Sequence, residues 1–179
     1  MKGTIVASRY AKSLLELSIE KNNLDKINDD MVQLSEICEE SKDLVNLLNN
    51  PVVNSDKKAS VFDKLFKGKF DELSLAFIQL INKNKREDIL PNIAQSFTQL
   101  YKAHKHILDV NLISATPLEE SVKSKIIDKI KAKYSDYTIN LIEKIDSSLI
   151  GGFIVKIGDK QIDSSIASQL TNLKNILLN

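Results

Sequence analysis

The sequence has a single cysteine, Cys38, in 179 residues, which excludes an internal disulfide framework and fits a reducing compartment. No run of apolar residues is long enough to cross a bilayer. The N-terminus has neither the pattern of a signal peptide nor that of an Arg- and Ser-rich transit sequence. We therefore expect a soluble protein that meets a membrane only through its partners.

Neither sign of charge is in excess. Lys and Arg number 25 against 24 Asp and Glu, and the two signs nearly balance within residues 1–104 and within residues 105–179. Neither half is a basic lobe, which argues against a nucleic-acid partner. The two histidines, His104 and His106, have no further ligands of suitable type nearby, so no metal site is expected.

The first 104 residues have the pattern of helices. Apolar residues recur at spacings of three and four, and breakers such as Pro51 and Gly68 separate the runs. Ser41 is placed to cap a short helix, and Asn54 or Ser55 to open the next. The pattern predicts six helices with short connections, and hence an antiparallel bundle.

Two of these helices have more apolar surface than one buried face requires. Residues 72–83 are apolar almost all round, and residues 4–20 carry two neighbouring apolar stripes, which are Val6, Tyr10, Leu14 and Leu17, and then Ala7, Ala11 and Leu15. Two interpretations are open. Both helices are central and wrapped by the others, or they leave a groove for an amphipathic helix of another protein.

The pattern changes after His104. Residues 107–114 alternate as a strand, and Thr116-Pro117 predicts a helix start with Thr116 as its cap. A second strand around 137–141 and a hairpin turning at Gly158-Asp159 follow, and then a last helix with Ile166, Leu170, Leu173 and Leu177. The order predicts a small α/β domain with a short mixed sheet whose first two strands are parallel. The predicted fold is therefore mostly α in two domains, 1–104 and 105–179.

Two near-identical Ile-Asp-Ser-Ser segments place Asp146 and Asp163 beside the hairpin. Such acids close turns and cap helices, so Asp163 or Ser164 is expected to cap the last helix. Acid–base catalysis is the alternative, although no residue is placed to tune either acid. Gly151 and Gly152 lack phosphate-loop spacing and instead predict a bulge or a close backbone approach.

Lysines crowd the predicted helix that follows Thr116, at positions 123, 125, 129, 131 and 133. A solvated helix face is one interpretation of such a cluster. A docking surface for an acidic helix or for a lipid surface is the other.

The segment 145–165 also carries a family resemblance. Its pattern, I-D-x-S-L-I-G-G-F-x-[aliphatic]-K-x-G-D-x-x-I-D-x-S, resembles the C-terminal signature of the delta subunit of F-type ATP synthases, whose mitochondrial counterpart is the oligomycin sensitivity-conferring protein. Further matches follow in family order and cover nearly the whole chain: Arg9-Tyr10-Ala11-Lys12, Asn84-Lys85-Arg86 and Ser114-Ala115-Thr116-Pro117-Leu118.

The resemblance implies a non-catalytic stator subunit that needs no cofactor. Residues 1–104 would bind the N-terminal helices of the alpha subunits of the catalytic head, and residues 105–179 the C-terminal region of the b subunits. A head held in this way lets rotor torque drive proton-coupled ATP synthesis. The protein would lie on the cytoplasmic side of a bacterial cell membrane, or at a plastid thylakoid.

By the same resemblance, the head contact is expected in a groove between the first and fifth helices, with Tyr10 as anchor and a lining of Val6, Tyr10, Leu14, Phe77, Leu80 and Ile81. The signature residues are expected to shape the C-terminal domain: Asp146, Gly151, Gly152, Gly158, Asp159 and Asp163. The alternatives are a helix-binding adaptor outside ATP synthase and a small enzyme that uses the Gly151-Gly152 turn.

Overall fold

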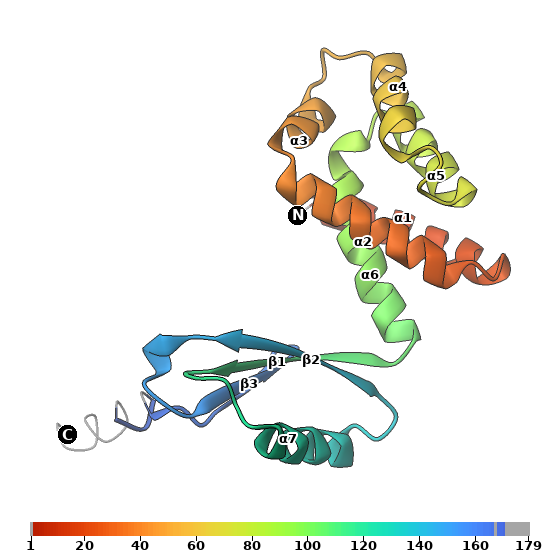
Figure 1. Ribbon diagram of the computed structural model, residues 1–179. Helices are drawn as coiled ribbons and strands as arrows, with labels where there is room; N and C mark the ends of the chain where they lie inside the picture. The colour runs from red at the N-terminus through yellow and green to blue at the C-terminus, as the bar shows by residue number, and fades with distance from the viewer. Residues whose placement is uncertain (1, 167, 171–179) are drawn as a thin grey trace. The chain divides into compact units, whose positions relative to one another are not determined.

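The computed structural model describes residues 2–166 and 168–170 (Figure 1). Contacts divide the chain into two compact units, Met1–Lys102 and Ala103–Asn179, which we call the N-terminal and C-terminal units. The described residues are mostly helical, with a four-stranded mixed sheet in the C-terminal unit. No helix among them has the length and apolarity needed to cross a membrane.

The helices of the N-terminal unit begin and end close to the predicted positions. They are α1 (Lys2–Glu20), α2 (Leu24–Glu40), α3 (Lys42–Asn49), α4 (Ser55–Phe66), α5 (Glu72–Lys83) and α6 (Leu90–His104), with a 3-10 turn η1 (Glu87–Ile89) before α6. The Ser41 hydroxyl accepts a hydrogen bond from the Leu44 N–H at 3.3 Å, which confirms the predicted cap of α3. Gly68 follows the end of α4 with φ at +82°, a conformation that favours glycine.

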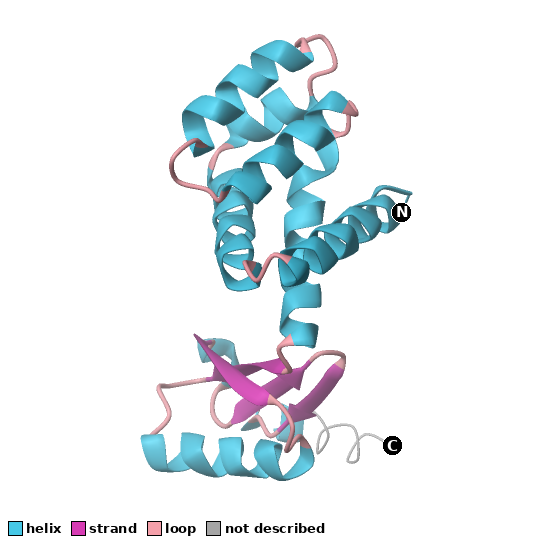
Figure 2. Ribbon diagram, turned by 90° about the vertical axis from the view of Figure 1, so that its right-hand side faces the viewer, coloured by secondary structure: helices cyan, strands magenta, loops and turns pink. Residues whose placement is uncertain are grey.

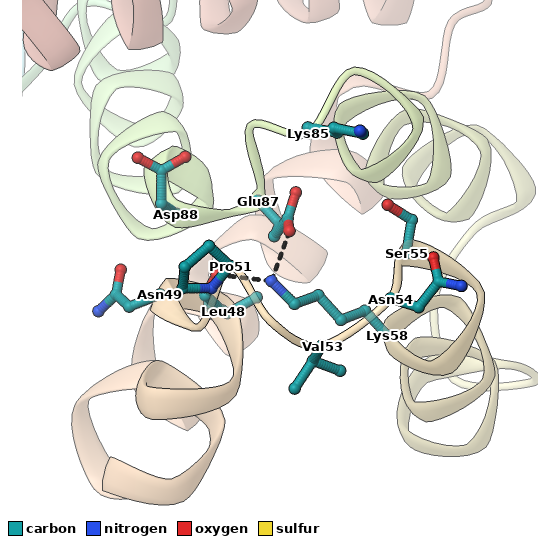
Figure 3. A pocket seen from close by; sticks show the side chains of 10 residues that line it. All are labelled: Leu48, Asn49, Pro51, Val53, Asn54, Ser55, Lys58, Lys85, Glu87 and Asp88. Atoms are coloured by element: carbon teal, nitrogen blue, oxygen red, sulfur yellow. Dashed lines mark hydrogen bonds and ion pairs between the residues drawn. The ribbon is translucent and has the colours of Figure 1, made fainter.

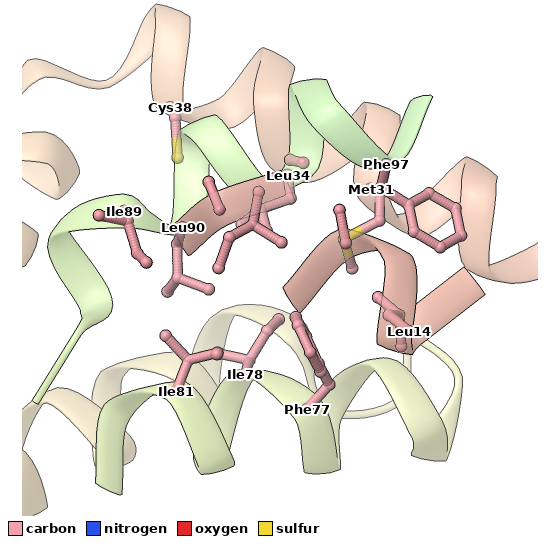
Figure 4. Packing of buried hydrophobic residues seen from close by; sticks show 14 of the residues in the cluster. Leu14, Met31, Leu34, Cys38, Phe77, Ile78, Ile81, Ile89, Leu90 and Phe97 are labelled. Carbon is pink, nitrogen blue, oxygen red and sulfur yellow. The ribbon is translucent and has the colours of Figure 1, made fainter. Parts of the chain in front are cut away.

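One hydrophobic cluster fills the N-terminal unit and draws residues from all six of these helices. Figure 4 shows part of it, with Leu14 of α1 and Phe77 of α5 near Met31 and Phe97. Cys38 lies in the same cluster, where burial raises the pKa of its thiol, as expected of an unreactive cysteine.

A buried ion pair joins three elements of the N-terminal unit. Lys58 of α4 is 1% exposed, and its Nζ donates to Glu87 Oε1 of η1 at 2.5 Å and to the Leu48 carbonyl of α3 at 3.0 Å (Figure 3). The lysine therefore satisfies a carbonyl at the end of one helix and compensates a buried carboxylate before another. Sequence patterns did not predict this pair.

The C-terminal unit contains β1 (Ile107–Ser114), α7 (Glu120–Lys133), β2 (Thr138–Ile145), a 3-10 turn η2 (Ser147–Leu149), β3 (Phe153–Ile157) and β4 (Lys160–Asp163). The strand order is β2-β1-β3-β4. β1 and β2 are parallel, as predicted, and the other two pairs are antiparallel. Helical backbone resumes at 166 and 168–170, and Leu173 and Leu177 of the predicted last helix lie outside the described residues.

The predicted start of α7 is wrong. The helix begins at Glu120 and its N-cap residue is Glu119, three residues beyond the predicted cap Thr116. Leu118 packs against the hydrophobic cluster of the C-terminal unit while still outside the helix. The local start signal at Thr116-Pro117 is therefore not followed, and residues 117–119 stay outside the helix.

α7 lies against one face of the sheet (Figures 1 and 2). The buried cluster between them takes side chains from α7, β1 and β3, namely Val110, Leu112, Ile126, Ile130 and Val155. Alternation along β1 sends Val110 and Leu112 toward α7 and leaves Asn111 exposed on the opposite face.

Candidate functional site

One apolar stripe of α1 is buried in the core and a neighbouring stripe is not. Ala7, Ala11, Leu14 and Ser18 recur at helical spacing and are at most 1% exposed. Beside them, Val6 and Tyr10 are only partly buried, and Leu17 is 38% exposed. The predicted surplus of apolar surface on this helix is therefore partly open to solvent.

α5 repeats this arrangement. The Asp71 carboxylate caps the helix by accepting from the Leu73 N–H at 2.9 Å. The buried face of α5 is formed by Ser74, Phe77, Ile78, Ile81 and Asn82. An adjacent stripe, Leu73, Ala76 and Leu80, is partly or fully exposed, with Leu80 at 49%.

The two helices meet at an aromatic contact. The rings of Tyr10 and Phe77 lie edge to face, with centroids 6.4 Å apart and an interplanar angle of 74°. This geometry is a favoured one for aromatic pairs, so it fixes the Tyr10 ring beside α5. We call the apolar side chains that remain accessible beside this contact the α1–α5 surface: Val6, Tyr10, Leu17, Leu73, Ala76 and Leu80.

The six predicted groove residues fall into two groups. Val6, Tyr10 and Leu80 are accessible to a partner. Leu14, Phe77 and Ile81 are 1%, 9% and 0% exposed, so they pack in the core beneath the accessible side chains. Helical periodicity identifies both stripes but does not show which of the two faces inward.

Two arginines not predicted as site residues lie beside this surface. A pocket of about 250 Å³ is lined by Val6, Arg9, Tyr10, Ser13 and Arg86. Both arginines are exposed, and both occur in the segments that carry the family resemblance. They give one edge of the α1–α5 surface a positive charge.

The two Ile-Asp-Ser-Ser segments form the same local structure. Asp146 Oδ1 accepts from the Ser148 N–H at 3.0 Å and from its hydroxyl at 2.6 Å. Asp163 Oδ1 accepts from the Ser165 N–H and hydroxyl at 2.9 and 2.7 Å, and its Oδ2 from the Ser168 hydroxyl at 2.7 Å. Both acids therefore close turns, in line with the turn interpretation of these residues.

The cap of the last helix is neither of the predicted residues. The Ser165 hydroxyl accepts from the Ser168 N–H at 3.3 Å, so Ser165 caps the backbone that turns helical at 166. Asp163 lies two residues earlier and orients Ser165. The prediction of Asp163 or Ser164 missed this cap by one or two residues.

The signature glycines allow the chain to pass close to itself. Gly152 has φ at +78°, and a Cβ placed on it would lie 2.2 Å from the Ser164 carbonyl oxygen. A Cβ on Gly151 would lie 2.6 Å from Ile166 Cδ1. The predicted close backbone approach is confirmed. Gly158, with φ at +54°, and Asp159 form the turn between β3 and β4.

Hydrogen bonds lower the pKa values of two carboxyl groups, and burial raises the pKa of a third. Bonds from Ser148 lower the pKa of Asp146 below 3.8, and bonds from Ser168 and Ser165 do the same for Asp163. Burial raises the pKa of Asp30, which also accepts from the Asp71 N–H at 2.9 Å. In the described part of the chain, no group of His, Cys, Asp or Glu could hold a metal ion.

We expect an NMR titration of the side-chain carboxyl carbons to place Asp146 and Asp163 below pH 3.8 and Asp30 above it. The lowered pair contributes stability that is present above pH 3.8 and is lost as the pH falls through the folded pKa values. Asp30 acts in the opposite sense, because ionising it in the folded state opposes folding as the pH rises. A midpoint for Asp163 at or above 3.8 would contradict its hydrogen bonding.

The chain matches the family described as the ATP synthase delta (OSCP) subunit over residues 6–177. It belongs to the ATP synthase delta (OSCP) subunit family. Its relatives include ATP synthase subunit delta of Cytophaga hutchinsonii, 35% identical over 98% of this chain and 95% of the relative. Another is that of Chlorobaculum tepidum, 32% identical over 99% of this chain and 98% of the relative.

A solved structure shares the fold. A chain in the cryo-EM structure of the Toxoplasma gondii mitochondrial ATP synthase hexamer superposes with a TM-score of 0.72 over 97% of both chains, at 23% identity. As a member of the delta (OSCP) family, the protein is a non-catalytic subunit of the peripheral stalk of F-type ATP synthase. This membership contradicts both alternatives, the small enzyme and the adaptor outside ATP synthase.

Proposed function

We propose that this delta-family chain ties the catalytic head of F-type ATP synthase to the b subunits. Residues 1–104 hold N-terminal helices of the alpha subunits, and residues 105–179 hold the C-terminal region of the b subunits. The complex then brings the protein to the cytoplasmic side of a bacterial cell membrane, where it is peripheral.

The observation that carries the head contact is the α1–α5 surface. The core beneath it is complete, since Leu14, Phe77 and Ile81 are already buried. The adjoining stripes on both helices nevertheless stay apolar and accessible, with Leu17 and Leu80 at 38% and 49% exposure. Two apolar stripes on neighbouring helices suit the apolar face of a third, amphipathic helix.

Tyr10 is the proposed anchor of this contact. Its ring is held against Phe77 at 6.4 Å, so little side-chain entropy remains to be lost when a partner binds. Arg9 and Arg86 beside it favour an incoming helix with an acidic residue near its apolar face.

This arrangement explains how a non-catalytic subunit contributes to ATP synthesis. The head turns with the rotor unless something holds it, and a held head converts torque into changes at its nucleotide sites. Two attachments on separate parts of one chain raise the effective affinity of the link, because release of one leaves the other in place.

Calorimetric titration with the N-terminal peptide of the same organism's alpha subunit tests the head contact. We expect one-to-one binding with a negative heat-capacity change, since apolar surface is buried. Tyr10→Ala and Leu80→Asp should each weaken binding at least tenfold, or about 1.4 kcal/mol, as for a central interface residue. Phe77 is less suitable, because it lies in the core and its truncation also changes folding.

A matched pair of variants on α1 serves as the control. Leu17 and Ile19 are 38% and 39% exposed but lie on opposite sides of the helix. We expect Leu17→Asp to weaken binding of the peptide and Ile19→Asp to leave it unchanged. Equal affinities for the two variants would remove the α1–α5 surface as the binding site.

A further inference from the structure

The two arginines of this chain meet at one pocket. Lysine supplies every other of the 25 basic residues, and Arg9 and Arg86 lie far apart in the sequence, on α1 and in the turn after α5. Both nevertheless line the pocket of about 250 Å³ beside the α1–α5 surface, which we call the arginine pocket. A chain that uses lysine at its other basic positions thus has a guanidinium at both basic positions of this pocket, which indicates a need for the planar geometry of that group.

The arginine pocket offers hydrogen-bond donors and no acid. Besides the two arginines, three residues line it, two of them with a hydroxyl that can donate: Val6, Tyr10 and Ser13. Neither arginine forms an ion pair with another described residue. The acids that follow Arg86 do not supply one, because Glu87 is bound to Lys58 and Asp88 lines a different pocket (Figure 3). The charge of the two guanidinium groups is therefore available to an acid of a partner.

The backbone of Arg86 is fixed on both sides. Before it, α5 ends in a Schellman motif, in which Lys85 has φ at +55° and the Arg86 N–H donates to the Ile81 carbonyl at 3.1 Å. A lysine adopts this left-handed conformation at an energetic cost that a glycine would avoid. After it, Glu87 is held by the buried Lys58. Only the side chain of Arg86 therefore remains to be ordered when a partner binds.

We propose that the arginine pocket binds one carboxylate of the helix that docks on the α1–α5 surface, with the guanidinium of Arg86 as a bidentate donor and that of Arg9 as a second donor. The pocket is continuous with that surface, because Val6 and Tyr10 belong to both. A carboxylate matches the planar fork of a guanidinium, whereas an ammonium offers only a point charge. The inference rests on the proposed function and adds the residues that select the partner helix by its charge.

Calorimetric titration of the full chain with two probes tests this pairing. The first is the N-terminal peptide of the same organism's alpha subunit, and the second is a designed helix with a leucine stripe and one glutamate beside it. We expect Arg86→Gln to weaken binding of both probes about tenfold, because a charge-assisted pair of hydrogen bonds is lost. Arg86→Lys keeps the positive charge and should still weaken binding about fivefold, since the fork is gone.

Replacing each acidic residue of the alpha peptide in turn by its amide identifies the paired carboxylate. One such replacement should weaken binding to the wild-type chain about tenfold but have little effect on binding to Arg86→Gln, as expected of two groups in contact. The same holds for a glutamine version of the designed helix. Lys57→Gln is the charge-matched control, because Lys57 is exposed on α4 and lies outside the pocket. It should change affinity less than about twofold.

Each outcome decides between the proposals. If the alpha peptide binds the wild-type chain and both Arg86 variants equally, while Leu80→Asp weakens it, the head contact stands and the arginine pocket is refuted. Equal affinities of the wild-type chain and Arg86→Lys alone would overturn the bidentate pairing. If only the designed helix binds, and Arg86→Gln weakens it, the pocket stands and the assignment to the alpha subunits fails. Failure of both probes to bind the folded chain overturns both proposals.

Discussion

Replacing Lys58 by methionine is expected to lower the free energy of unfolding by about 3–5 kcal/mol. The substitution keeps an unbranched apolar stem of similar size but removes the ammonium. Glu87 would then stay buried without its 2.5 Å partner, and the Leu48 carbonyl would lose its 3.0 Å donor. Glu87 Oε2 has no hydrogen-bond partner among the described residues, so loss of the Lys58 bond to Oε1 would leave both oxygens without one.

Urea denaturation followed by far-ultraviolet circular dichroism measures this effect. Lys57→Met is the matched control, because Lys57 is exposed on the same helix and should change stability by no more than about 0.5 kcal/mol. The double variant Lys58→Met with Glu87→Leu should recover part of the loss, since both buried charges are then gone. Equal stability of the Lys57 and Lys58 variants would show that Lys58 is not buried in a pair.

Replacing Gly152 by alanine is the second large effect, a loss of roughly 2–5 kcal/mol in the C-terminal unit. The new Cβ would lie 2.2 Å from the Ser164 carbonyl oxygen and 3.0 Å from Ser165 Cα, both of them backbone atoms. The φ of +78° adds its own penalty for any side chain. Relief of the clash requires the start of β3 and the segment after β4 to move apart.

Gly158→Ala separates the two contributions to this loss. Gly158 also has a positive φ, +54°, but a Cβ there would meet no atom within 4 Å. We expect it to lose only the backbone term, about 1–2 kcal/mol. Hydrogen exchange of the β1 and β3 amides reports on the C-terminal unit directly, and faster exchange for Gly158→Ala than for Gly152→Ala would contradict this explanation.

Much of the fold could be predicted because local signals agreed with long-range packing. Apolar spacing, Pro51 and Gly68 placed the helices of the N-terminal unit, and alternation with the Gly158 turn placed β3 and β4. The prediction of where α7 begins was wrong, because there the local signal and the observed structure disagree. Thr116 and Pro117 form a strong local start signal, but the helix begins at Glu120, and Leu118 packs against the hydrophobic cluster from outside the helix.

The site was harder to predict than the fold. A stripe pattern shows that α1 and α5 are apolar on adjoining faces, but not which face meets the core, so Leu14 and Ile81 were placed in the groove although both are buried. Lys58 carries no sequence signal of burial, because a lysine on an amphipathic helix normally faces solvent.

The central claim is that one chain holds the head and the stalk at the same time. Its most direct test is calorimetry of the full chain with the alpha N-terminal peptide, first alone and then with the b C-terminal peptide at saturation. We expect one-to-one binding of each peptide, with affinities that change less than twofold when the other is present. Competition between the two peptides for one surface, or failure of the well-folded chain to bind either, would contradict the claim.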